Sequence, residues 1–189
     1  DFDHDSPALR PLLESDHTMV LLNRRGPGFP SVSVDNRHGG RIAIDYLLGR
    51  GHRRLAVVTG DGPIGEDRYT GIREAFLSAG LEPGLQVGAK WDRGRAHGGI
   101  LPMLGTTSRP TAVFAFSDWM ALGVLSAARE AGLRVPEDLS VMGFDDAIIA
   151  ETSEPGLTTV RQPRFRLGAS AVGVLAALVT VFKQRRDIA

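Results

Sequence analysis

The chain has 189 residues, and its 22 Lys and Arg residues balance its 22 Asp and Glu residues, so the formal net charge is zero. A domain that binds nucleic acid by itself usually carries a basic excess, and this composition shows none. The sequence contains no cysteine, which excludes disulfides, thiolate metal sites and a thiol nucleophile.

Short apolar runs alternate with segments of helical period along the chain. In chain order we expect a strand at 18–23, an extended piece at 31–36, a helix at 36–48, a strand at 53–60, a helix at 67–79, a weaker strand at 85–91, a helix at 93–104, a strand at 111–117, a helix at 119–131, strands at 139–145 and 157–162, and a final helix from about Arg164. Asp118 is expected to cap the helix at 119–131. Strand–helix–strand units at this spacing predict an α/β fold with a parallel, doubly wound sheet.

The two ends of the chain lack the patterns of targeting and membrane segments. Residues 1–13 are acidic, without the basic and apolar regions of a signal peptide. The apolar run 167–182 is shorter than the ~20 residues that span a bilayer as a helix, which favours a buried or interface helix. Because a polar segment precedes the first strand and no strand follows the last helix, we expect a fragment of a longer protein.

Polar residues follow most of the predicted strands. In open parallel sheets, ligands bind where the carboxyl ends of the strands meet. The candidates are Asn23, Thr59 with Asp61, Trp91 with Asp92, Ser117 with Asp118, Asp145 with Asp146, and Gln162.

The adjacent carboxylates Asp145 and Asp146 raise the question of catalysis or metal binding. Side chains of an extended strand alternate between faces, so the two carboxylates would not share one site, which disfavours an acid pair. The five histidines show no pairing at ligand spacing, so we expect no metal site. We predict that Asp145 contacts a ligand and that Asp146 caps the following turn.

A GxGxxG pattern at Gly60, Gly62 and Gly65 raises the alternative of a nucleotide loop. Proline at position 63 removes a backbone donor, and the nearby carboxylates of Asp61, Glu66 and Asp67 would repel a pyrophosphate. A nucleotide site is therefore disfavoured. Arg68 offers planar, multi-donor recognition of hydroxyls or a carboxylate, although an ordinary surface arginine would fit the sequence as well.

Two further residues have open interpretations. Ser117 is not in a GxSxG elbow, so hydrolase chemistry has little support, and its hydroxyl suits either a ligand or the local backbone. Trp91 could stack on a sugar ring or could be a half-buried packing residue.

Four blocks of the sequence resemble the effector-binding core of lactose/galactose-repressor (LacI/GalR) family regulators. They are VSVDNRHGGRIAIDYLLGRGHRRLAVVTG, RYTGIREAFLSAGL, RPTAVFAFSDWMALGVLSAAREAGLRVPEDLSVMGFDD and LTTVRQPRFRLGASAV. The resemblance runs from about Thr18 to Leu178, and the order and spacing of the blocks match the family.

The resemblance implies two Rossmann-like subdomains with parallel sheets and a ligand cleft between them, the type I periplasmic-binding-protein fold. Residues 1–31 and 163–189 would form part of the N-terminal subdomain, and residues 32–162 most of the C-terminal one. The family's helix-turn-helix DNA-binding domain precedes this core and is absent from the chain, as are the core's first strands and its usual last strand.

The resemblance also implies roles for single residues. Asp145 matches the family's cleft aspartate, Arg68 its clamp arginine, and Trp91 the place of a stacking aromatic. Asn23 stands where many members have Asp, and Ser117 where Asn is common, beside a matching Asp118. These departures leave the identity of the sugar open. Gln162 completes the expected effector-binding set.

The expected function is that of a cytoplasmic regulator's ligand-sensing core, without catalysis or cofactors. A sugar-like effector would control operator DNA binding through the missing headpiece, in a homodimer that has no membrane contact. The alternative is a periplasmic sugar-binding protein of the same fold, and the missing N-terminal sequence would discriminate them. A small nucleotide-dependent enzyme lacks both a nucleophile–base pair and a clean phosphate loop.

Overall fold

The computed structural model describes residues 11, 15, 17–25 and 28–186. The chain divides into two compact units. Unit 1 combines Asp1–Val34 with Pro163–Ala189, and unit 2 is the continuous stretch Asp35–Gln162.

Unit 2 is built on a five-stranded parallel sheet. Its strands are β3 (Leu55–Thr59), β4 (Leu85–Gly88), β5 (Ala112–Ala115), β6 (Ser140–Asp145) and β7 (Thr158–Arg161), in the spatial order β4-β3-β5-β6-β7. Every neighbouring pair is parallel. All residues of β3 and β5 are buried, as expected for continuous apolar strands covered on both faces. The predicted α/β class with a parallel sheet is confirmed.

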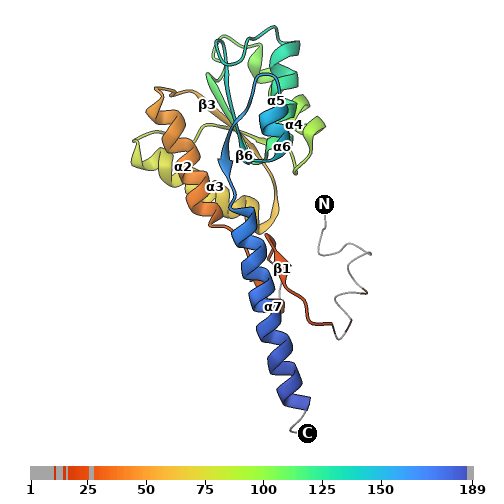
Figure 1. Cartoon of the computed structure of the whole chain (residues 1–189). Helices are drawn as coiled ribbons and strands as arrows, with labels where there is room; N and C mark the ends of the chain where they lie inside the picture. Colours follow the sequence, from red (N-terminus) through yellow and green to blue (C-terminus); the bar gives the residue numbers. More distant parts are fainter. Residues whose placement is uncertain (1–10, 12–14, 16, 26–27, 187–189) are drawn as a thin grey trace. The chain divides into compact units, whose positions relative to one another are not determined.

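Helices cover both faces of this sheet, as Figure 1 shows. The pair α2 (Asn36–Gly49) and α3 (Gly62–Ser78) covers one face, and α4 (Arg93–Leu104) and α5 (Asp118–Glu130) cover the other, together with the short α6 (Ile148–Thr152). The start of α2 is fixed by Asp35, whose side chain accepts a hydrogen bond from the His38 backbone at 2.8 Å. Ile44 of α2 and Ile72 of α3 are fully buried.

Three local features differ from the sequence prediction. Helix α3 begins at Gly62, five residues earlier than expected, because Pro63 occupies the first turn, where a missing N–H costs nothing. The cap of α5 is Ser117 and not Asp118, since the Ser117 hydroxyl accepts from the Met120 backbone at 3.2 Å. Helix α6 was not predicted, and its five residues carry no side-chain cap.

Unit 1 contains the two-residue strands β1 (Leu21–Leu22) and β2 (Ser31–Val32), which pair in parallel, and the long helix α7 (Arg164–Arg186). Helix α7 contacts both strands. It leaves Phe165 and Val172 largely exposed. Within the described part of the chain, no helix combines the length and the apolar character that a membrane crossing requires.

Candidate effector-binding site

The chain leaves the extended conformation at the end of β6. Asp145 has φ 121° and Asp146 has φ 54°. The sequence prediction assumed that strand alternation sets the directions of their side chains, and this assumption is wrong. Asp146 is not the turn cap either. Its carboxylate pairs with Arg161, and the Ala147 backbone that opens α6 donates instead to Asp118 at 2.8 Å. A carboxylate that is distant in the sequence thus holds this turn.

The Asp145 carboxylate lies between an amide and a guanidinium. Its Oδ1 atom accepts a hydrogen bond from Gln162 Nε2 at 2.6 Å. The same oxygen is 4.0 Å from Arg68 Nη2, which is too far for a hydrogen bond. The Asp145 side chain is 35% exposed. The carboxylate is therefore held near a cation without closing on it.

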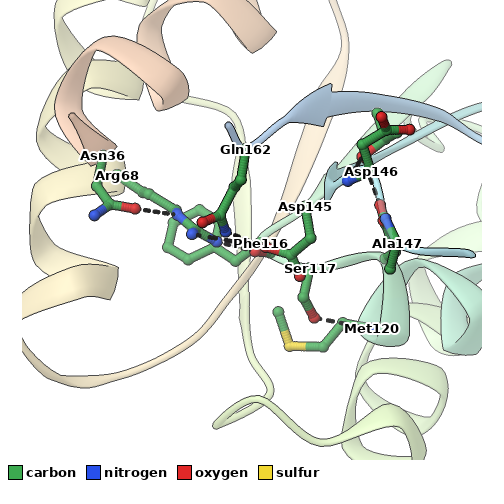
Figure 2. Close-up of polar contacts among 11 residues, drawn as sticks. Asn36, Arg68, Phe116, Ser117, Met120, Asp145, Asp146, Ala147 and Gln162 are labelled. Carbon is green, nitrogen blue, oxygen red and sulfur yellow. Dashed lines mark hydrogen bonds and ion pairs between the residues drawn. The ribbon is translucent and has the colours of Figure 1, made fainter. Parts of the chain in front are cut away.

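Arg68 is a buried arginine and not a surface one, with 2% of its area exposed. Its Nε atom donates to Asn36 Oδ1 at 2.9 Å, and its Nη1 atom donates to the Phe116 carbonyl; both contacts are drawn in Figure 2. Its guanidinium carbon lies 3.5 Å from the centre of the Phe144 ring, a cation–π contact. Neutral acceptors and an aromatic face thus fix this side chain.

The charge of Arg68 survives its burial. Burial lowers the pKa of Arg68 to about 10, and the negative charges of Asp145 and Asp118 act in the opposite direction. The guanidinium is therefore protonated at neutral pH, and it brings a positive donor to the carboxyl end of the sheet.

Trp91 lies beside Arg68, with its ring centre 5.5 Å from the guanidinium carbon. Its indole Nε1 donates to the Asp61 carbonyl at 3.0 Å. A Cβ atom at Gly60 would lie 2.1 Å from the indole ring, and one at Gly65 would lie 2.3 Å from the Gly60 carbonyl. Close packing therefore accounts for two glycines of the GxGxxG pattern without a nucleotide.

Ser117 and Asp118 are both engaged inside unit 2. The Ser117 hydroxyl caps α5. Asp118 is fully buried, and its two oxygens accept from Thr159 Oγ1 at 2.6 Å and from the Ala147 backbone. Burial raises the pKa of Asp118, against the effect of these hydrogen bonds. Both residues organise the backbone around the site.

Asn23 is the one predicted site residue that belongs to unit 1. It has φ 51°, and its backbone N–H donates to Val32 at 2.7 Å. Its side-chain oxygen is buried without a hydrogen-bond partner among the described residues. The other six predicted residues, Arg68, Trp91, Ser117, Asp118, Asp145 and Gln162, all belong to unit 2.

The sequence prediction missed Asn36, which is 1% exposed and accepts from Arg68. Its position beside the capping Asp35 made it look like a helix-start residue.

For metals, the described residues contain no group of three or more His, Asp or Glu side chains that could hold an ion. The polar groups of the site are instead a positively charged donor, Arg68, and a carboxylate acceptor, Asp145.

A family model described as periplasmic binding protein-like domain matches residues 44–187, so the fold and the matched residues define a domain of this class. In the curated proteins, the chain is 38% identical over 166 residues to the HTH-type transcriptional repressor PurR of Proteus mirabilis, covering 84% of this chain and 48% of that protein. It is 39% identical over 153 residues to the regulator GalS of Salmonella typhimurium, covering 77% and 44%. The chain spans about half the length of these relatives.

Solved structures give the same result. A LacI family transcriptional regulator from Mycobacterium smegmatis has a TM-score of 0.83 and 38% identity, covering 95% of this chain and 67% of that one. A complex of the transcriptional regulator CelR with cellobiose has a TM-score of 0.74 and 35% identity, covering 82% and 50%. The chain belongs to the LacI family and corresponds to its effector-binding core.

Proposed function

We propose that this chain is the ligand-sensing core of a LacI-family transcriptional regulator, a repressor whose operator affinity depends on a sugar-like effector. The observation that carries the proposal is the open pair between Arg68 and Asp145. A buried, protonated donor and a partly exposed acceptor lie 4.0 Å apart, an ion-pair distance that is too long for a direct hydrogen bond.

A ligand hydroxyl matches this gap chemically. It can accept from Arg68 and donate to Asp145 at the same time, because a hydroxyl has both functions. Two hydrogen bonds of about 2.8 Å each are long enough to bridge atoms that are 4.0 Å apart. The nearby indole of Trp91 offers an apolar face to the C–H side of a ring. A neutral, polyhydroxylated ligand therefore fits the site better than an anion or a nucleotide.

The mechanism we propose is allosteric and not catalytic. Unit 1 would be part of the family's N-terminal subdomain and unit 2 most of the C-terminal one. Effector binding in a cytoplasmic homodimer would change the presentation of DNA-binding headpieces that lie outside this chain. If the two sites are coupled, effector and operator must change each other's affinity by the same factor.

Thermal-shift screening of the full-length regulator with sugars tests the effector claim, with cellobiose as the first probe because CelR is solved with it. We expect at least one sugar to raise the melting temperature, and Asp145→Ala to abolish that shift. Asp138→Ala is the matched control, because Asp138 is a carboxylate bound to Arg134 elsewhere on unit 2. An equal shift in Asp145→Ala and wild type would remove Asp145 from the site.

Operator titrations with and without the active sugar test the coupling. Operator affinity that stays constant at saturating sugar would contradict the regulatory mechanism while leaving the binding site intact. Sugar binding without any binding to operator DNA would instead favour the alternative of a periplasmic sugar-binding protein. The resemblance to named repressors and regulators supports the regulator over that alternative.

A further inference from the structure

The buried carboxylate of Asp118 contacts the backbone directly after Asp145. Its Oδ2 atom accepts from the Ala147 N–H at 2.8 Å, and its Oδ1 atom accepts from the Thr159 hydroxyl at 2.6 Å. The Thr159 oxygen in turn accepts from the Asp146 N–H at 3.3 Å. One side chain on α5 therefore anchors two consecutive peptide units of another loop, one directly and one through a hydroxyl.

The anchored segment is conformationally unusual. Asp145 and Asp146 both have positive φ values, 121° and 54°, a region that residues with a Cβ atom rarely adopt. Such conformations persist only where the surrounding structure fixes them. The hydrogen bonds that end on Asp118 supply this constraint immediately after Asp145.

Asp118 is not needed for the helix on which it lies. The hydroxyl of Ser117 already caps α5, and the carboxylate oxygens of Asp118 are directed to Thr159 and Ala147. Gly143 of β6 leaves room for them because it has no side chain. A Cβ atom at that position would lie only 2.3 Å from Asp118 Oδ1. The carboxylate thus occupies space that β6 leaves open opposite a glycine.

The chemistry at this position requires two acceptors. A carboxylate accepts at both oxygens, whereas an asparagine amide has one acceptor and one donor. An amide at position 118 would face either the Ala147 N–H or the Thr159 hydroxyl with a donor group, although the hydroxyl could rotate. A carboxylate, though costly to bury, therefore fits this place better than an amide.

We propose that Asp118 is a positioning residue of the effector site, which holds residues 145–147 in their positive-φ conformation and thereby places the Asp145 carboxylate where Gln162 can bind it. The geometric part of this proposal stands on the contacts within unit 2. Its relevance to an effector rests on the proposed function. Asp118 would then act through the backbone and would not touch the ligand.

The test uses the ¹⁵N-labelled chain without any ligand, so its outcome is independent of the proposed function. Three-bond couplings between the amide and α protons report φ at Asp145 and Asp146, and hydrogen exchange reports protection of the Ala147 amide. For Asp118→Asn we expect both couplings to move toward extended values. We also expect Ala147 to exchange about tenfold faster, because a neutral amide replaces a carboxylate and charge-assisted hydrogen bonds are roughly twice as strong.

Further variants separate positioning from general stability. Thr159→Val removes the bridging hydroxyl at nearly constant volume and remains informative if Asp118→Asn does not fold. Thr159→Ser restores the hydroxyl and should restore the wild-type coupling at Asp146. Asp138→Asn is the matched control, because Asp138 also accepts from a backbone N–H, that of Arg134 at 2.9 Å. It should leave the couplings at Asp145 and Asp146 unchanged.

Unchanged couplings at Asp145 and Asp146 in folded Asp118→Asn or Thr159→Val would overturn the proposal, even if the variant were less stable. A general loss of stability lowers the melting temperature without selectively changing these two φ angles. Failure of every sugar to bind the wild-type regulator would contradict the proposed function and leave the coupling result untouched.

Discussion

Two arginine–aspartate pairs in unit 2 behave in opposite ways. Arg134 and Asp138 lie on the turn before β6 and form a closed, bidentate pair, with Nε–Oδ2 at 2.7 Å and Nη2–Oδ1 at 2.9 Å. The Arg134 side chain is 71% exposed. Arg68 and Asp145 include a buried guanidinium, yet their nearest distance is 4.0 Å. The more solvent-exposed pair, Arg134 and Asp138, is therefore the one joined by direct hydrogen bonds.

The difference follows from what holds each partner. Arg134 and Asp138 are four residues apart on one turn, so either side chain can adjust to the other. Arg68 is fixed by Asn36, Phe116 and Phe144, while Asp145 is fixed by Gln162. Because a buried charge without a partner is costly, the neutral acceptors around Arg68 compensate its charge. An ion pair that a fold keeps open in this way is suited to a ligand.

The largest effect is expected for Arg68→Met, which keeps an apolar side chain against Phe144 but removes all donors. Asn36 Oδ1 and the Phe116 carbonyl would lose this donor, and each such loss in a buried place costs roughly 1–3 kcal/mol. Denaturant unfolding should therefore show a loss of about 2–6 kcal/mol. Arg134→Met is the control on the exposed pair. Equal effects of the two substitutions would show that burial does not distinguish these arginines.

An intermediate effect is expected for Gln162→Leu, which removes the amide donor to Asp145. We expect the carboxylate to move toward Arg68 and close the pair, at a net cost of about 1 kcal/mol because one charged hydrogen bond replaces another. A crystal structure or a carboxylate ¹³C titration would detect the change. Gln86→Leu is a suitable control, since Gln86 donates to the neutral hydroxyl of Thr59. A 4.0 Å gap that persisted in Gln162→Leu would mean that the backbone alone keeps the pair open.

The smallest effect concerns the pH dependence of the closed pair. Hydrogen bonds from Arg134 hold the pKa of Asp138 well below its ordinary value of 3.8. Because the folded pKa is lowered, the stabilisation is fully present above about pH 4 and is lost as pH falls through the folded pKa. The difference in unfolding free energy between wild type and Asp138→Asn should therefore shrink below pH 4, and salt should reduce it at neutral pH. A constant difference at all pH values would contradict this assignment.

The sheet of unit 2 could be predicted from the sequence because its strands are continuous apolar runs. Residues 111–117 and 139–145 contain β5 and β6, and the polar residues that follow them lie at one edge of a parallel sheet. Arg68 lies four residues before the fully buried Ile72, a spacing that places both on one helix face. That spacing could have favoured a buried arginine over a surface one.

Other features depend on contacts that a local pattern does not contain. Ser117 and Asp118 are both good helix caps, and the choice between them is decided by Thr159 and Ala147, which are 41 and 29 residues from Asp118. The positive φ values of Asp145 and Asp146 have the same origin, so strand alternation could not predict their directions. Helix α6 has five residues, too few for a helical period to be recognised.

The position of Gln162 has a consequence for a chain that is still being made. Gln162 directly follows β7, one of the two edge strands of the sheet, whereas Asn36 opens the first helix of unit 2. The polar cluster around Arg68 and Asp145 therefore spans the whole of this unit. Since domains fold as units during synthesis, a ribosome must release residue 162 before Asp145 meets its amide donor. A nascent chain that ends before residue 162 would contain Arg68 and Asp145 but not the amide that binds the Asp145 carboxylate. It would therefore lack the complete effector site that we propose.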